Sequence, residues 1–132
     1  MLDFLNGDSC PCGSGERYPQ CCKPYLEGER YPDNALALMR SRYVAYGINQ
    51  ADYLIQTTHR QNEAYRKDIK AWRKDLGAHC ARLGIKGLEI KGFEPGESVS
   101  FVTFIAQFTL DGEPVVLCEK SRFEKVGQRW LY

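Results

Sequence analysis

Four of the six cysteines in this chain lie within thirteen residues near its start, at Cys10, Cys12, Cys21 and Cys22. They form two close pairs with eight residues between them. Four thiolates that can converge on one point suit a tetrahedral Zn²⁺ ion, and the glycines of residues 13–15 let the backbone fold close to the sulfur atoms. The alternatives are a disulfide or free thiols, but adjacent cysteines rarely bridge each other. The stretch therefore predicts a structural zinc site whose four positions are all filled by cysteine.

The same stretch resembles the SEC-C motif, a zinc-binding module named for the C-terminal tail of the bacterial preprotein translocase ATPase. That motif reads C-x-C-G-S, then a spacer of about this length, then C-C or C-H. The four clustered cysteines match its four ligands, and Gly13-Ser14 matches its Gly-Ser. The resemblance implies that Cys10, Cys12, Cys21 and Cys22 bind one Zn²⁺.

The composition favours a globular protein in a reducing compartment. Apolar residues make up 43% of the chain and charged residues 27%, which is the usual range for globular domains. The net charge of +1 favours neither nucleic acid nor an anionic membrane as a partner. No apolar run approaches the roughly 20 residues that cross a bilayer, and residues 1–8 lack the basic segment of a signal peptide. We therefore expect a cytoplasmic protein with no nucleic-acid or membrane partner.

The hydrophobic pattern divides the chain into a small module at 1–28 and a larger domain at 29–132. The module has too few apolar residues to fold by burial alone, so metal binding must contribute to its stability. In the larger domain, apolar residues first repeat at helical spacing and then alternate as in strands. We expect helices that begin at Asp33 or Asn34, after Asn49 and near Gln61, the first ending at Gly47 and the third near Leu76, and strands at 85–93, 98–110, 114–125 and 128–132. The order predicts an α+β domain in which three helices cover one face of a four-stranded antiparallel sheet.

Residues 34–132 look like the nuclear transport factor 2-like (NTF2-like, or cystatin-like) fold. In this fold a curved antiparallel sheet wraps around a long helix, and the two together form a cone. They are most similar to the YchJ family of bacterial proteins, which join a SEC-C motif to such a domain. The segments that carry this likeness are 38–46, 52–54, 57–59, Trp72, 101–108, 119–123 and 130–132. The family often shows His-Pro where this chain has His59-Arg60. The resemblance implies a fold and a zinc site but no established activity.

The third predicted strand places a carboxylate on its inward face. Glu119 and Ser121 share parity with Leu117 and Phe123, so we expect Glu119 to point toward the helices. A buried carboxylate needs a partner, and the first helix offers Arg40 or Arg42. Such a pair is either a structural link between helix and sheet or part of a pocket in which Glu119 acts as a base. The candidate pocket residues are Arg40, Arg42, Tyr43, His59, Trp72, Phe104, Glu119 and Ser121.

Two functions fit these observations. The first is a zinc-binding adaptor whose cysteine module presents a surface to a protein partner. The second is a small-molecule-binding protein or enzyme that uses the interior of the cone, with Glu119, His59 and Tyr43 as its working groups. An open cavity of several hundred cubic ångströms that reaches Glu119 favours the second function, and a filled interior favours the first.

Overall fold

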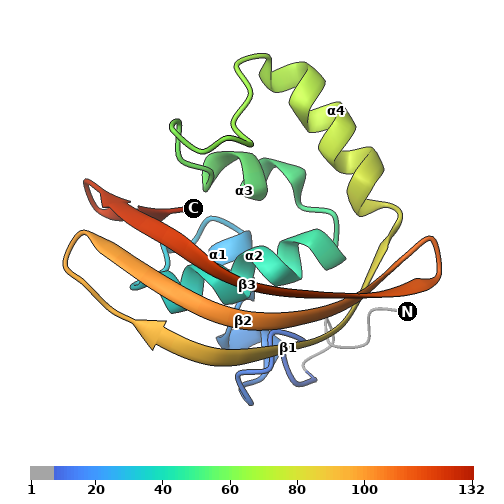
Figure 1. The fold of residues 1–132 in the computed structure, drawn as a ribbon, viewed down its shortest axis with the longest axis horizontal. Coiled ribbons are helices and arrows are strands. Elements are labelled where there is room, and N and C mark those ends of the chain that lie inside the picture. The colour runs from blue at the N-terminus through green and yellow to red at the C-terminus, as the bar shows by residue number, and fades with distance from the viewer. Residues whose placement is uncertain (1–7) are drawn as a thin grey trace.

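The computed structural model describes residues 8–132, which form an α+β fold with one four-stranded antiparallel sheet (Figure 1). A short 3₁₀ helix at Tyr18–Gln20 and helix α1 (Lys23–Leu26) follow the first cysteines. Three more helices come next and are followed by all of the strands. Their bounds are α2 (Ala35–Gly47), α3 (Ala51–Gln56), α4 (Ile69–Cys80), β1 (Leu83–Glu94), β2 (Val99–Leu110), β3 (Glu113–Val126) and β4 (Arg129–Leu131). The described residues thus contain four α-helices where three were expected, the addition being α1 beside the second cysteine pair.

Helix α2 begins where the sequence predicted, because Asn34 caps it. The Asn34 side chain accepts a hydrogen bond of 2.8 Å from the Ala37 N–H, which satisfies one of the free donors of the first turn. Its buried residues surround much of the helix. Helix α2 packs against β1, β2 and β4 and also against α1 and α3. It is therefore the central element of the fold.

The predicted start of α4 at Gln61 is wrong, because the helix begins at Ile69 after a cap at Asp68. The residues before it make local side-chain hydrogen bonds that compete with a helix. The Gln61 N–H donates to His59 Nδ1, and the Ala64 N–H donates to the Asn62 side chain. These turns hold residues 59–64 outside the helix.

The sheet is a meander in the order β1-β2-β3-β4, as the alternating pattern predicted. Asp111 and Gly112 join β2 to β3 with φ angles of 54° and 83°, the left-handed conformations of a tight hairpin turn. Opposite residues include Phe104 with Glu119 and Val102 with Ser121. Because paired residues point to the same side of a sheet, Glu119 and Ser121 share the inward face with Phe104 and Val102.

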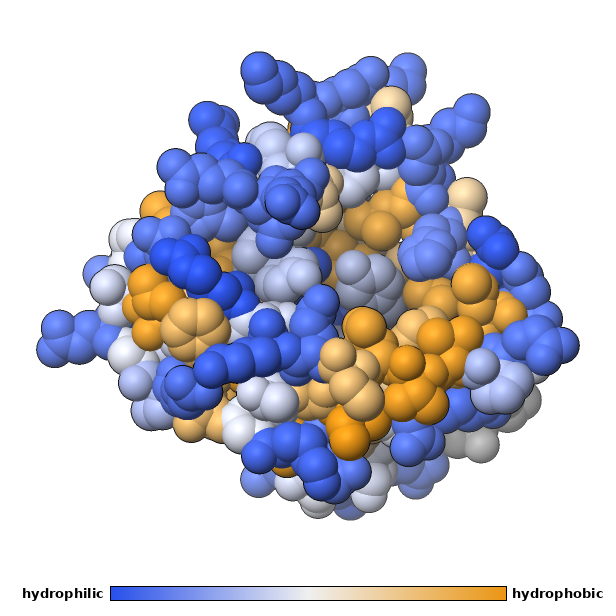
Figure 2. Space-filling model, in the orientation of Figure 1, coloured by the Kyte–Doolittle hydropathy of each residue, from blue (hydrophilic) through white to orange (hydrophobic). Residues whose placement is uncertain are grey.

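The main core lies between α2 and the inward face of β2. Leu38 and Ala45 on α2 and Val102 on β2 are fully buried. Figure 2 shows that one face of the molecule is hollowed between the hydrophilic side chains over α4 and strand β3, with hydrophobic side chains beside the hollow. Within residues 8–132, no helix is long and apolar enough to span a membrane.

Candidate metal centre and adjoining cavity

A compact turn brings the two cysteine pairs together. Ser9 and Arg17 form an isolated β-bridge, and the Cys10 N–H donates to the Glu16 carbonyl at 2.8 Å. Gly13 sits within this turn at a φ of 80°, where a side chain would be strained. A Cβ at this position would also come within 2.6 Å of the Leu88 carbonyl oxygen on β1. Only glycine therefore fits between the turn and the sheet.

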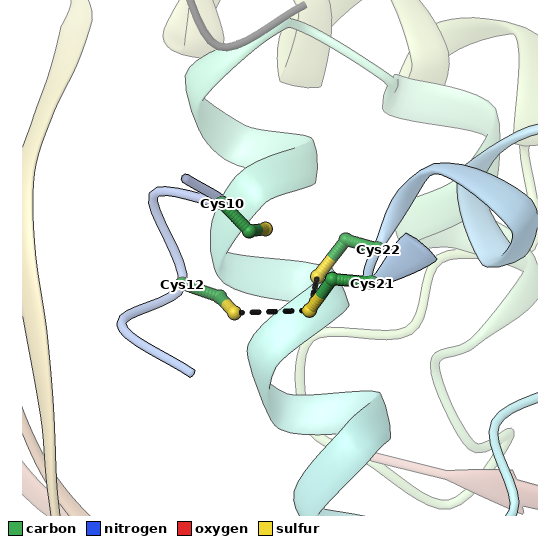
Figure 3. Close-up of side chains that lie close together, drawn as sticks. All are labelled: Cys10, Cys12, Cys21 and Cys22. Carbon is green, nitrogen blue, oxygen red and sulfur yellow. Dashed lines mark hydrogen bonds between the residues drawn. The ribbon is translucent and has the colours of Figure 1, made fainter. Parts of the chain in front are cut away.

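The four sulfur atoms lie in an arrangement that fits a tetrahedral metal ion (Figure 3). The Sγ atoms of Cys10, Cys12, Cys21 and Cys22 are all within 4.8 Å of one another. The Sγ of Cys21 is 3.5 Å from that of Cys12 and 3.9 Å from that of Cys22. Zn–S bonds of about 2.3 Å place the sulfurs of a tetrahedral site about 3.8 Å apart. Four soft ligands at this separation are typical of a closed structural zinc site.

The surroundings of the sulfurs favour a thiolate at Cys12. Hydrogen bonds from Cys10 and Cys22 lower the pKa of the Cys12 thiol, and the bond from Cys10 has the larger effect. The hydrogen bond to Cys12 is also the main cause that raises the pKa of Cys10 to about 12. Ser14 Oγ lies 3.1 Å from the Cys21 sulfur and can donate to it when that sulfur is a ligand. A divalent cation that displaces the remaining protons would neutralise half of the negative charge of the four thiolates.

The cysteine module is attached to α2 by a hydrogen bond and by a small core of its own. Arg40 Nη1 donates to the Cys12 carbonyl oxygen at 2.6 Å. Val44, on the same helix, is fully buried in a cluster with Cys10, Cys12, Tyr18 and Cys22. Helix α2 therefore packs on the sheet with one side and on the cysteine module with another.

A second site is a cavity of about 240 Å³ between α2 and the inward face of the sheet, on the hollowed face in Figure 2. Its lining is mostly apolar and includes five of the predicted pocket residues: Arg42, Tyr43, Phe104, Glu119 and Ser121. The structure also places Met39, Tyr46, Leu117 and Tyr132 along it. Tyr46 follows Tyr43 on α2 at helical spacing, so its place beside the cavity agrees with the periodicity of the sequence, but no sequence signal placed Tyr132 there.

Three predicted pocket residues are not among those that line this cavity. Arg40 contacts the cysteine module. Trp72 packs edge-on against Tyr65, with ring centroids 5.3 Å apart. His59 Nε2 lies 3.0 Å from a carboxylate oxygen of Glu124, at the outer side of β3.

The expected ion pair between Glu119 and an arginine of α2 is wrong. Glu119 does lie on the inward face of β3, but its side chain accepts a hydrogen bond of 2.8 Å from Ser121 Oγ. Arg42 Nη1 instead donates to the Leu54 carbonyl oxygen and to the hydroxyls of Thr57 and Thr58. The end of α3, and not Glu119, therefore supplies the hydrogen-bond partners of the Arg42 guanidinium.

Comparison with known proteins agrees with both resemblances drawn from the sequence. The model of the YchJ middle NTF2-like domain matches residues 34–132. The solution structure of a SEC-C motif containing protein from Rhodopseudomonas palustris is similar over 92% of each chain, with 32% identity and a TM-score of 0.78. The crystal structure of a SEC-C motif containing protein from Psychrobacter arcticus matches 99% of this chain and 82% of its own, with 26% identity and a TM-score of 0.73.

Proposed function

This chain belongs to the YchJ family through its NTF2-like domain, and we propose that its clustered cysteines hold one structural Zn²⁺ that fastens the N-terminal module to that domain. The observation that carries the proposal is the convergence of four sulfur atoms within 4.8 Å. Two similar solved structures are of SEC-C motif containing proteins, which supports the same assignment. When bound, the ion supplies a cross-link and a compensating positive charge. The protein's own contribution is to bury three of the four ligands and to brace the Cys12 carbonyl with Arg40.

Native mass spectrometry with Cys12→Ser tests this proposal. We expect one zinc per wild-type chain and less than one in the variant, because three thiolates and a hydroxyl form a weaker site. Cys118→Ser is the matched control, since Cys118 is an exposed cysteine on β3 outside the cluster. Full zinc occupancy in Cys12→Ser would refute the assignment, as would an equal loss in both variants.

For the larger domain, we propose that the protein binds a small molecule in the cavity, in preference to acting only as an adaptor. A cavity of about 240 Å³ that reaches Glu119 supports this choice, because a filled interior would have favoured the adaptor. The side of the module that holds the cysteines is also covered by α2, which leaves less of its surface to a protein partner. Ala106→Leu tests the proposal, since Ala106 is buried and lines the cavity. The larger side chain is expected to remove small-molecule binding while the fold is kept.

A further inference from the structure

Arg42 is a buried cation whose protein partners are all uncharged. Its side chain is only 6% exposed, and it donates from Nη1 to Leu54, Thr57 and Thr58. Within residues 8–132, none of the salt bridges joins Arg42 to an aspartate or glutamate. A buried charge is unfavourable unless it is paired. Arg42 therefore lacks the counter-ion that such a position calls for.

The same guanidinium faces the cavity. Arg42 lines the cavity, and its hydrogen bonds to Leu54, Thr57 and Thr58 all use Nη1, which leaves the other N–H groups of the guanidinium to the neighbouring Tyr46 hydroxyl and to a ligand. The ring of Tyr132 stacks over it at 4.7 Å and holds it in place. Burial lowers the pKa of Arg42, and the neighbouring Tyr46 and Tyr132 oppose that change. An anion in the cavity would pair with the N–H groups of the guanidinium that Leu54, Thr57 and Thr58 leave open.

The rest of the cavity is suited to an apolar body. Phe104, Phe108, Leu117 and Ile85 are among its walls. Its volume of about 240 Å³ exceeds the roughly 150 Å³ in which an apolar protein cavity holds benzene. A single aromatic ring with a short acidic side chain is therefore a fitting size.

Glu119 limits the charge of the ligand. Its carboxylate lines the same cavity and is exposed toward solvent. Glu119, Tyr132 and Arg42 all line this cavity, and burial, and next the charge of Glu119, raises the pKa of Tyr132. A second negative charge on a ligand would meet Glu119 and be repelled.

We infer that the cavity takes a small monocarboxylate with an apolar body, whose carboxylate pairs with Arg42. The inference rests on the proposed small-molecule function and adds the chemical class of the ligand. Arg42 supplies the charge and the paired donors, the walls supply apolar contact, and Glu119 disfavours dianions. The expected ligands are aryl or short aliphatic carboxylates.

The test compares three probes on the zinc-loaded full chain by NMR titration at a mildly alkaline pH: phenylacetate, its neutral isostere phenylacetamide, and benzylphosphonate, which is a dianion at that pH. We expect phenylacetate to shift the amide signals of Ser121 and Tyr132, which line the cavity, and to bind at least about tenfold more tightly than phenylacetamide. Benzylphosphonate is expected to bind more weakly than phenylacetate, and Glu119→Gln to reduce that difference.

Variants separate the role of Arg42 from the presence of the cavity. Arg42→Lys keeps a positive charge but loses the two-pronged donor, so phenylacetate affinity should fall about tenfold or more. Arg73→Lys, an exposed arginine on α4 paired with Asp52, is the control and should bind as wild type does. If Arg42→Lys does not fold, the comparison of acid with amide on the wild-type protein decides the matter.

Each outcome distinguishes the inference from the function on which it rests. Equal binding of phenylacetate and phenylacetamide, lost in Ala106→Leu, would overturn the role of Arg42 and leave the cavity as a neutral binding site. Tighter binding of benzylphosphonate than of phenylacetate would overturn the preference for a single charge. No binding of any probe to the wild-type protein would overturn both the inference and the small-molecule function.

Discussion

Replacing Val44 by alanine should weaken zinc binding, although Val44 is not a ligand. Val44 is fully buried on α2, and its neighbours in the core cluster are Cys10, Cys12, Tyr18 and Cys22. The change deletes two buried methyl groups. At about 0.5–1.5 kcal/mol for each, the zinc-loaded protein should lose about 1–3 kcal/mol of unfolding free energy. If the module leaves α2 when zinc is removed, the same contacts are absent from the metal-free protein.

Linkage then requires the free energy of zinc binding to weaken by the same amount, so the zinc dissociation constant rises. A loss of about 1–3 kcal/mol corresponds to a weakening of about 5- to 150-fold. Urea unfolding of the zinc-loaded protein, followed by circular dichroism, measures the first quantity. Competition with a chromophoric chelator measures the second.

Val116→Ala is the matched control, because Val116 lies on β3 and is 62% exposed. Its effect on stability should stay within about 0.5 kcal/mol, with unchanged zinc affinity. The reasoning is refuted if Val44→Ala destabilises the protein as expected but leaves zinc affinity at the wild-type value. That result would mean that the contacts of Val44 with the module do not depend on the metal.

Two further predictions concern polar groups of the core. Burial raises the pKa of Tyr53 to about 12. The neutral phenol therefore stabilises the fold by roughly 2–3 kcal/mol below the usual pKa of about 10. This contribution is lost as the pH rises from about 10 through 12. Urea unfolding between pH 9 and about 12 should show a shallower alkaline decline in Tyr53→Phe, and an unchanged decline would contradict the argument. Thr57→Val removes a hydroxyl that accepts from Arg42 at 2.7 Å and donates to the Tyr53 carbonyl, which should cost about 1–3 kcal/mol by denaturant unfolding. The control Thr103→Val lies on the outward face of β2 and should change stability by less than about 0.5 kcal/mol; equal effects would show that the bond to Arg42 contributes little.

The elements that could be predicted from the sequence depend on residues close together along the chain. Asn34 caps α2 because an Asx side chain reaches the N–H three residues later. Asp111-Gly112 turns the chain because both residues tolerate a positive φ. The four cysteines meet because a glycine-containing loop of eight residues joins two close pairs. Strand parity likewise placed Glu119 on the inward face of β3.

The partners of buried polar groups were decided by the tertiary structure. Strand parity and charge paired Glu119 with Arg40 or Arg42, but Arg40 binds the Cys12 carbonyl, and the end of α3 brings a carbonyl and two threonine hydroxyls to the Arg42 guanidinium. Nothing near Val44 in the sequence indicates that the cysteine module covers it, and nothing near Tyr132 indicates that its ring lies over Arg42. Periodicity shows that a side chain is buried, whereas the identity of its neighbour depends on how distant elements pack. The sequence therefore determined the cysteine site and the order of elements, and the packing around α2 decided the cavity and the chemistry that it offers.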